Sequence, residues 1–122
     1  DSGLVVPSLN GAPGILSARW GGPKKDFGLA MQKVYNKVKK KNKFAWFVSA
    51  IAIVFPDGEK KIFEGRVYGN LTWPPKGKLG FGYDPMFVPI GYKKTFGEME
   101  EKNKNKISHR ALAFKQLFNF LF

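Results

Sequence analysis

The segment "FAWFVSAIAIVF", residues 44–55, limits the possible folds of this chain more than any other stretch. It is too apolar for an exposed strand and rich in residues that favour β-structure, so it predicts a buried central strand. The "PDG" at 56–58 is a turn signal, and "KKIFEGRVYGNL" at 60–71 then predicts the second strand of a hairpin. Gly65 and Gly69 in that second strand indicate a bulge or the close approach of another backbone.

Two helices are predicted from apolar spacing and from residues that cap helix N-termini. Asp26 is a candidate N-cap for a helix over roughly 26–41, and Ser108 is a candidate N-cap for a helix that runs to the end of the sequence. The apolar stripe of the first helix consists of Phe27, Met31, Val34 and Val38, at spacings of four, three and four. The second helix is so apolar that we expect it to be buried against the sheet or a partner.

The remaining segments predict shorter elements. We expect short strands at 3–6 and 85–90, and a charged loop over 95–106 that contains a turn of helix. Together these elements predict an α/β fold with a mixed central sheet flanked by helices, organised as one domain over residues 1–122.

Composition limits the function through charge and cysteine content. The 122 residues include 21 Lys and Arg against 9 Asp and Glu, a net charge of +12, and no cysteine. Disulfides and thiolate metal sites are therefore excluded, and a reducing, cytoplasmic location is expected. A positive field attracts nucleotides, nucleic acids or acidic membrane surfaces. Because only three of the basic residues are Arg, a functional basic surface and a simple bias of codon usage both stay open as explanations.

Residues able to carry catalysis are few. His109 is the single histidine, and its neighbour Ser108 would not face it on a helix, so a Ser-His-Asp triad is not expected. One histidine without cysteine also argues against zinc. Asp84 lies in a glycine-flanked turn, where it can face a cleft or serve only the turn. Lys104, His109 and Arg110 form a donor-rich cluster, either an anion site or a solvated basic turn.

The stretch "LGFGYDPMF", residues 79–87, is the most ambiguous part of the sequence. Its glycines are typical of loops that cradle phosphates, and Phe81, Tyr83 and Asp84 could equally frame a flat ring. A tight turn between two buried segments is the third interpretation.

Four motifs in order resolve much of this ambiguity. They are "DSGLVVPSLNGAPGILSARWGG", "GKLGFGYDPMFVP", "TFGEM" and "KNKISHRALA". In this order and spacing they resemble the inosine triphosphate pyrophosphatase family, also called Ham1-like, over essentially the whole sequence. The resemblance implies a two-lobed α/β fold and Mg²⁺-dependent hydrolysis of ITP, dITP and XTP to a nucleoside monophosphate and pyrophosphate. It also implies a homodimer.

The same resemblance assigns roles to individual residues. Asp1 matches the aspartate that accepts a proton and helps to hold the metal, and Ser2 matches a substrate contact beside it. Phe81, Gly82, Tyr83 and Asp84 match the loop that frames base and sugar. Lys104 matches a lysine that contacts the substrate, and His109 and Arg110 match the pair that reads the purine edge.

Two other interpretations stay open beside the enzyme. The family pattern includes an N-terminal phosphate loop and an acidic metal ligand that these 122 residues do not contain, so we expect the isolated chain to hydrolyse little ITP and to associate. A catalytically silent piece of the enzyme is therefore one alternative. The other is a basic nucleic-acid-binding module in which lysines and aromatic residues follow a backbone.

Overall fold

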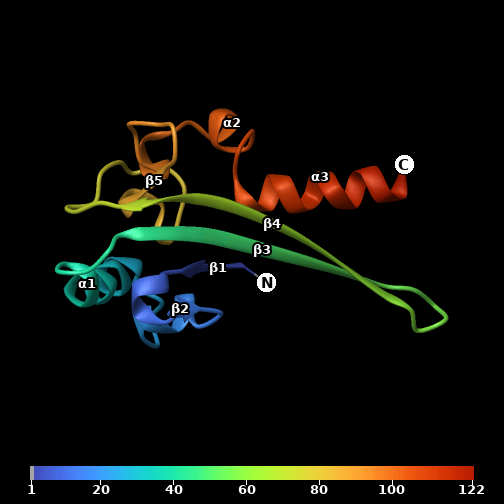
Figure 1. Cartoon of the computed structure of the whole chain (residues 1–122), viewed down its shortest axis with the longest axis horizontal. Helices are drawn as coiled ribbons and strands as arrows, with labels where there is room; N and C mark the ends of the chain where they lie inside the picture. The colour runs from blue at the N-terminus through green and yellow to red at the C-terminus, as the bar shows by residue number, and fades with distance from the viewer. Residues whose placement is uncertain (1) are drawn as a thin grey trace.

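The fold is built on one antiparallel sheet, described by a computed structural model for residues 2–122. The five strands have the spatial order β2-β1-β3-β4-β5 (Figure 1). The bounds are Ser2–Val5 for β1, Pro13–Gly14 for β2, Phe44–Val54 for β3, Lys60–Leu71 for β4 and Phe87–Pro89 for β5. The expected α/β fold and the central position of the 44–55 segment in the sheet are confirmed. Its burial is confirmed only for Ala45, Phe47 and Ser49 in the first half of the segment.

The hairpin of β3 and β4 is the longest feature of the sheet. Its register runs without interruption from Phe44 opposite Asn70 to Val54 opposite Lys60. A short turn can join only antiparallel neighbours, and β1 and β5 also add in the antiparallel sense. Every strand pair among residues 2–122 is therefore antiparallel, and the expectation of a mixed sheet is wrong in this respect.

Both predicted helix caps are confirmed. The Asp26 carboxylate accepts a hydrogen bond from the Leu29 backbone N–H at 3.1 Å, and the Ser108 hydroxyl accepts one from the Ala111 N–H at 3.1 Å. The α-helices are α1 (Phe27–Val38), α2 (Glu101–Lys104) and α3 (His109–Leu121), and the 3-10 helices are η1 (Pro7–Leu9), η2 (Ser17–Gly21), η3 (Asp84–Met86) and η4 (Phe96–Glu98).

Helix α1 is shorter than the predicted 26–41. The Lys43 ammonium donates hydrogen bonds to the carbonyls of Val38, Lys39 and Lys41. These bonds satisfy carbonyl groups that a longer helix would have used internally, so the chain can turn away after Val38.

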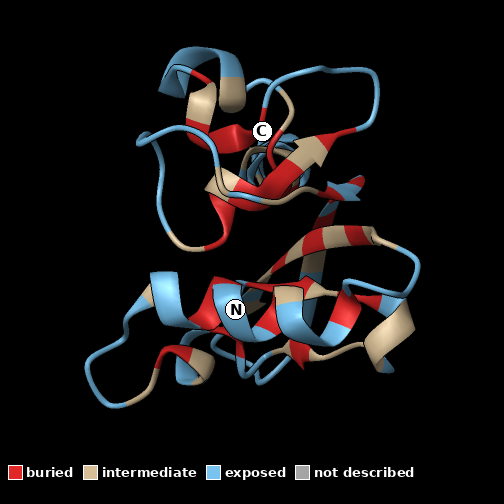
Figure 2. Ribbon diagram, turned by 90° about the vertical axis from the view of Figure 1, so that its left-hand side faces the viewer, coloured by how far each residue is buried: buried red, intermediate tan, exposed pale blue. Residues whose placement is uncertain are grey.

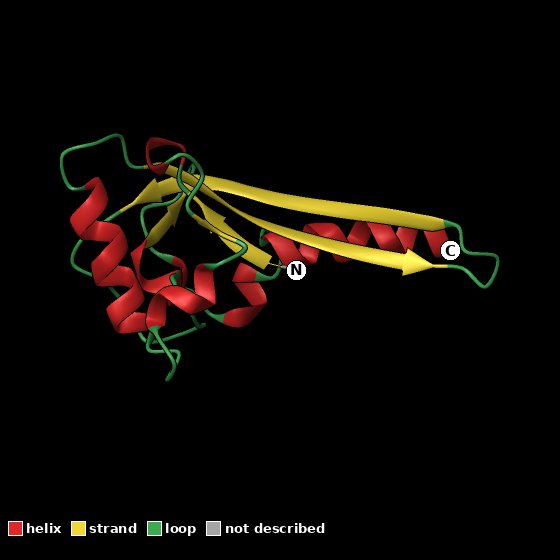
Figure 3. Ribbon diagram, turned by 90° about the horizontal axis from the view of Figure 1, so that it is seen from below, coloured by secondary structure: helices red, strands yellow, loops and turns green. Residues whose placement is uncertain are grey.

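Helices α1 and α3 lie at opposite ends of the hairpin, and α3 runs along its strands (Figures 1 and 3). Buried residues occur in the strands and at intervals along the front helix, whereas most residues of the outer loops are exposed (Figure 2). Within α3 only His109 and Ala113 are buried. The prediction that the sheet covers the last helix therefore holds for its first turns alone, and burial of the rest against a partner stays a prediction.

The helices of residues 2–122 are also too short or too polar to cross a lipid bilayer.

Candidate functional site

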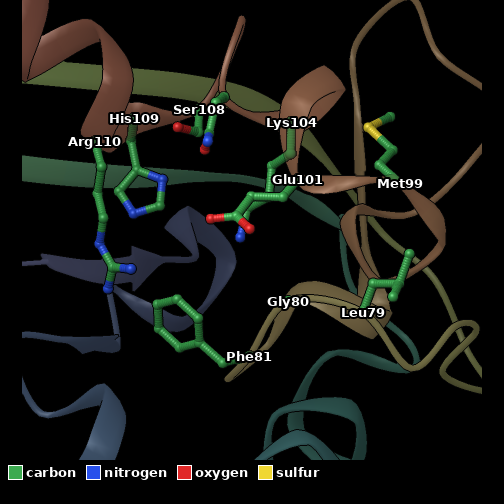
Figure 4. Close-up of a pocket in the computed structure, with 10 residues that line it drawn as sticks. Leu79, Gly80, Phe81, Met99, Glu101, Lys104, Ser108, His109 and Arg110 are labelled. Carbon is green, nitrogen blue, oxygen red and sulfur yellow. The ribbon is translucent and has the colours of Figure 1, made fainter.

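Two adjoining cavities open where the loop at 79–84 meets α2 and the start of α3. Their volumes are about 510 and 150 Å³, and both are lined by Phe81, Lys104, His109 and Arg110. Figure 4 shows these four residues around the larger cavity. The smaller cavity is also lined by Ser2, Gly82, Tyr83 and Asp84. The structure thus brings together eight residues that the sequence singles out from four separate segments. Asp1, the ninth, lies outside the described residues.

Asp84 anchors the glycine-rich loop from inside. Its Oδ2 accepts hydrogen bonds from the Phe81 backbone N–H at 3.0 Å and from Lys104 Nζ at 2.5 Å, and the residue is only 3% exposed. Gly80 has a φ of +71°, and a Cβ there would overlap the Asp84 carboxylate. The glycine is therefore required for this turn, and the carboxylate is engaged by the loop and the lysine.

The two aromatic residues of the loop have different surroundings. Tyr83 is buried, its hydroxyl donates to the Ser17 carbonyl at 2.6 Å, and its ring packs edge-on against Phe27. Burial raises the pKa of this phenol, so it stays protonated. Phe81 is 54% exposed, and the Arg110 guanidinium lies 4.2 Å from the centre of its ring. Of the two rings only Phe81 is therefore exposed at the cavity, where Arg110 and Lys104 lie over it.

His109 is fixed by one polar and one aromatic contact. Its Nε2 lies 2.8 Å from the Ser2 hydroxyl, and its ring stacks on Phe47 with the ring centres 5.0 Å apart. Burial, followed by the charges of Arg110 and Lys104, lowers the pKa of His109 to about 3. The imidazole is thus neutral near pH 7, and its buried Nδ1 has no hydrogen-bond partner in the part of the chain that the structure describes.

Lys104, His109 and Arg110 present donors to a ligand, and Glu101 adds one carboxylate acceptor in the larger cavity. Arg110 and Lys104 carry only N–H donors, and a neutral imidazole can donate from one ring nitrogen. Such a set matches keto oxygens and phosphate oxygens. Residues 2–122 contain no group of three or more His, Cys, Asp or Glu side chains able to hold a metal ion. The described residues therefore form no such ligand group on their own, and the expected magnesium site, which includes Asp1, stays a prediction.

Sequence reasoning missed four residues that shape the site. Glu101 lines the larger cavity, Phe47 stacks on His109, and Ser17 and Phe27 hold Tyr83. The alternation along β3 could have placed Phe47 on the buried face, because it lies two residues from Ala45 and Ser49 on the same side. No local signal marks the others, since their roles arise from contacts between distant segments.

Comparison with known proteins shows the same pattern across nearly the whole chain. The model of the Ham1 family matches residues 1–120. The dITP/XTP pyrophosphatase of Caulobacter vibrioides is 54% identical over the whole of this chain and 64% of its own length. The dITP/XTP pyrophosphatase of Rhodospirillum centenum is 50% identical over 96% of this chain and 60% of its own length.

A solved structure agrees with these sequences. The Ham1 protein of Staphylococcus aureus superimposes with a TM-score of 0.95 at 41% identity, over 99% of this chain and 64% of that protein. The chain therefore spans about three fifths of the length of the relatives that it matches. Motif order, site geometry and overall superposition agree, and this chain belongs to the Ham1 family.

Proposed function

We propose that the protein containing this chain hydrolyses non-canonical purine nucleoside triphosphates such as ITP, dITP and XTP to the monophosphate and pyrophosphate. The names of the relatives support the dITP and XTP substrates. The observation that carries the proposal is the set of donors from Lys104, His109 and Arg110 around the exposed Phe81 ring.

This donor set favours purines with a keto group at position 6. Hypoxanthine and xanthine carry an acceptor oxygen there, whereas adenine carries an amino donor. Adenine would leave donors of His109 or Arg110 unpaired, at a cost of about 1–3 kcal/mol for each lost bond. Guanine shares the keto oxygen, so its rejection has to involve position 2 of the ring.

The phosphates are expected to lie away from Phe81, toward Asp1. Asp1 is the proposed acceptor of a proton from the attacking water, as in the family pattern. Mg²⁺ is part of the same proposal and would neutralise phosphate charge when bound. A homodimer and a cytoplasmic location complete the proposal, and the exposed apolar half of α3 is compatible with contact between two copies.

The test is pyrophosphate release by the natural full-length protein. We expect dITP and XTP to be cleaved far faster than dATP, with a nucleoside monophosphate as the second product. Arg110→Ala should lower this preference by about tenfold or more, because a bidentate donor is lost. Equal rates for dITP and dATP would refute the base-recognition proposal. Salt-sensitive binding of oligonucleotides without any pyrophosphate release would favour the nucleic-acid module.

A further inference from the structure

A row of three small residues crosses the sheet beneath the start of α3. Ser2 on β1 is opposite Ser49 on β3, and Ser49 is opposite Gly65 on β4. Residues directly opposite in antiparallel strands present their side chains on the same face. Ser49 and Gly65 are both buried on that face. Because these side chains are small, the row forms a flat surface on the sheet, here called the seat, on which another element can pack closely.

Gly65 sets how closely α3 approaches this seat. A Cβ at residue 65 would overlap the His109 carbonyl oxygen, and it would also crowd the Ala113 nitrogen and the Leu112 side chain. The first turn of α3 thus lies directly on the β4 backbone. This is the close approach that the glycine in the predicted strand indicates, and the continuous register excludes a bulge there. The positions of His109 and Arg110 depend on the absence of a side chain at 65.

Ser2 and Phe47 then fix the imidazole within the seat. The Ser2 hydroxyl is hydrogen-bonded to Nε2, and the Phe47 ring covers one face of the imidazole. Figure 4 shows the His109 ring between Arg110 and the side of the cavity that holds Lys104 and Glu101. Of the two His109 ring nitrogens, Nδ1 is the one without a hydrogen-bond partner among the described residues. An unpaired buried polar atom is costly, so a ligand that satisfies it gains affinity.

We propose that Gly65 and Ser2 are positioning residues for purine recognition, with Gly65 setting the depth of the first turn of α3 and Ser2 holding His109 as the Nδ1–H tautomer. The Ser2 hydroxyl donates to Nε2, and Nδ1–H is then the donor kept for the keto oxygen of the base. Because Nδ1 is shielded from solvent, neighbouring side chains have to part before the base reaches it. The inference rests on the proposed substrate class.

The neutral state of the ring makes the tautomer decisive. The lowered pKa of His109 keeps the imidazole uncharged near pH 7, so only one nitrogen carries a proton. If Nε2 carried the proton instead, Nδ1 would be an acceptor and would repel a keto oxygen. The serine hydroxyl can both donate and accept, and when it donates to Nε2 it selects the Nδ1–H tautomer, which can donate to a keto oxygen.

The tautomer can be read directly by nitrogen-15 NMR, since His109 is the single histidine of these 122 residues. We expect the Nδ1–H form at pH 7. Ser2→Ala should give a mixture of tautomers, and Ser2→Thr, which keeps a hydroxyl, should restore the single form. Ser49→Ala, which removes the neighbouring hydroxyl in the same row, should leave the spectrum unchanged. An Nε2–H form in the unsubstituted protein would overturn the role of Ser2.

The role of Gly65 is tested against a matched glycine on the same strand. A Cβ at Gly69 would overlap the Val88 carbonyl and crowd Phe87 rather than α3. Both Gly65→Ala and Gly69→Ala should therefore lower stability. Only Gly65→Ala should lower the ratio of kcat/KM for dITP to that for dATP, by about tenfold, the loss of roughly one directed hydrogen bond.

The outcomes separate this inference from the proposed function. If the unsubstituted protein shows no preference for dITP over dATP, the proposed function fails. If it shows that preference and Gly65→Ala alters it no more than Gly69→Ala does, the inference fails and Gly65 is only a packing residue. If Ser2→Ala weakens nucleotide binding without changing the His109 tautomer, Ser2 contacts the substrate directly and the positioning role is wrong.

Discussion

The two ends of α3 lie on the same hairpin but differ in burial. At its start, His109 is 5% exposed and Ala113 is fully buried against β3 and β4. At its end, Phe118 is 52% exposed and Phe122 is 89% exposed. The hairpin changes in the same direction, since Ala45 in β3 is buried and Val54 is 67% exposed. The start of α3 is therefore part of the core and its end is surface, although the end is the more apolar of the two.

The difference follows from what covers each end. Near the start of α3 the hairpin is joined by β1 and β5, and η4 supplies Phe96 to a cluster with Phe47 and Phe87. Near its end the sheet has only two strands, and the contacts are an aromatic group in which Phe120 meets Phe63. Two-stranded ribbons are marginal alone. The candidate site lies at the more closely packed end, where neighbouring strands and buried rings surround its side chains.

The largest expected effect is on stability at the site end. Phe96→Ala should lower the free energy of unfolding by about 3–5 kcal/mol, because a fully buried ring leaves a cavity among Phe47 and Phe87. Phe118→Ala should cost less than about 1 kcal/mol, because that ring is half exposed. Urea denaturation measures both. Equal losses of unfolding free energy in the two variants would contradict the difference in packing between the two ends. If the loss caused by Phe118→Ala grows with protein concentration, Phe118 lies between two copies of the chain.

The next effect concerns the buried ion pair of Asp84 and Lys104, whose side chains are 4% and 12% exposed. Asp84→Asn should lower the free energy of unfolding by about 3 kcal/mol, since it leaves the Lys104 charge buried without its partner. The matched control is Glu64→Gln, which breaks the exposed pair with Arg66. Solvent screens that pair, so the urea midpoint should stay unchanged. A similar loss in both variants would contradict the special role of the loop anchor.

A smaller effect should appear as a pH dependence of stability. The pKa of His109 is about 3 in the folded protein against an ordinary value of 6.5. Between these values the unfolded chain binds a proton that the folded protein does not, so stability falls as the pH falls below 6.5. At pH 4.5 the loss should be about 2–3 kcal/mol.

Because carboxylates titrate in the same range, the measurement is a difference between curves. Unfolding of the unsubstituted protein and of His109→Gln is compared from pH 7 to pH 4.5. The free energy of unfolding of His109→Gln should fall less steeply with falling pH than that of the unsubstituted protein, even if the variant is less stable at pH 7. Parallel curves would mean that His109 is not held neutral by its surroundings.

The sequence predicts the hairpin well and the contacts between distant segments poorly. The predicted strand 60–71 coincides with β4, and the predicted 44–55 ends one residue from the end of β3. The apolar, β-forming composition of 44–55 and the "PDG" turn are local signals, so they can be read without the rest of the fold. The overestimated end of α1 has a local cause that apolar spacing does not reveal, since the Lys43 side chain bonds helix-end carbonyls four and five residues earlier.

The candidate site shows the same division. The four motifs predict that the eight described residues share one site, and these residues do line the same two cavities. The inward turn of the Asp84 carboxylate and the bond between Ser2 and His109 could not be predicted. These contacts join residues whose separation in the chain reaches 107 positions. Residue types alone cannot specify which donor meets which acceptor across such a distance.

If the proposed function is right, the exposed Phe81 ring binds the base and the phosphates bind elsewhere. Calorimetric titration of the full-length protein with inosine monophosphate and, separately, with pyrophosphate tests it most directly. Phe81→Ala should raise the Kd of inosine monophosphate by about tenfold, the value of one base–aromatic stack, and leave the Kd of pyrophosphate unchanged. Equal weakening of both ligands would contradict the account.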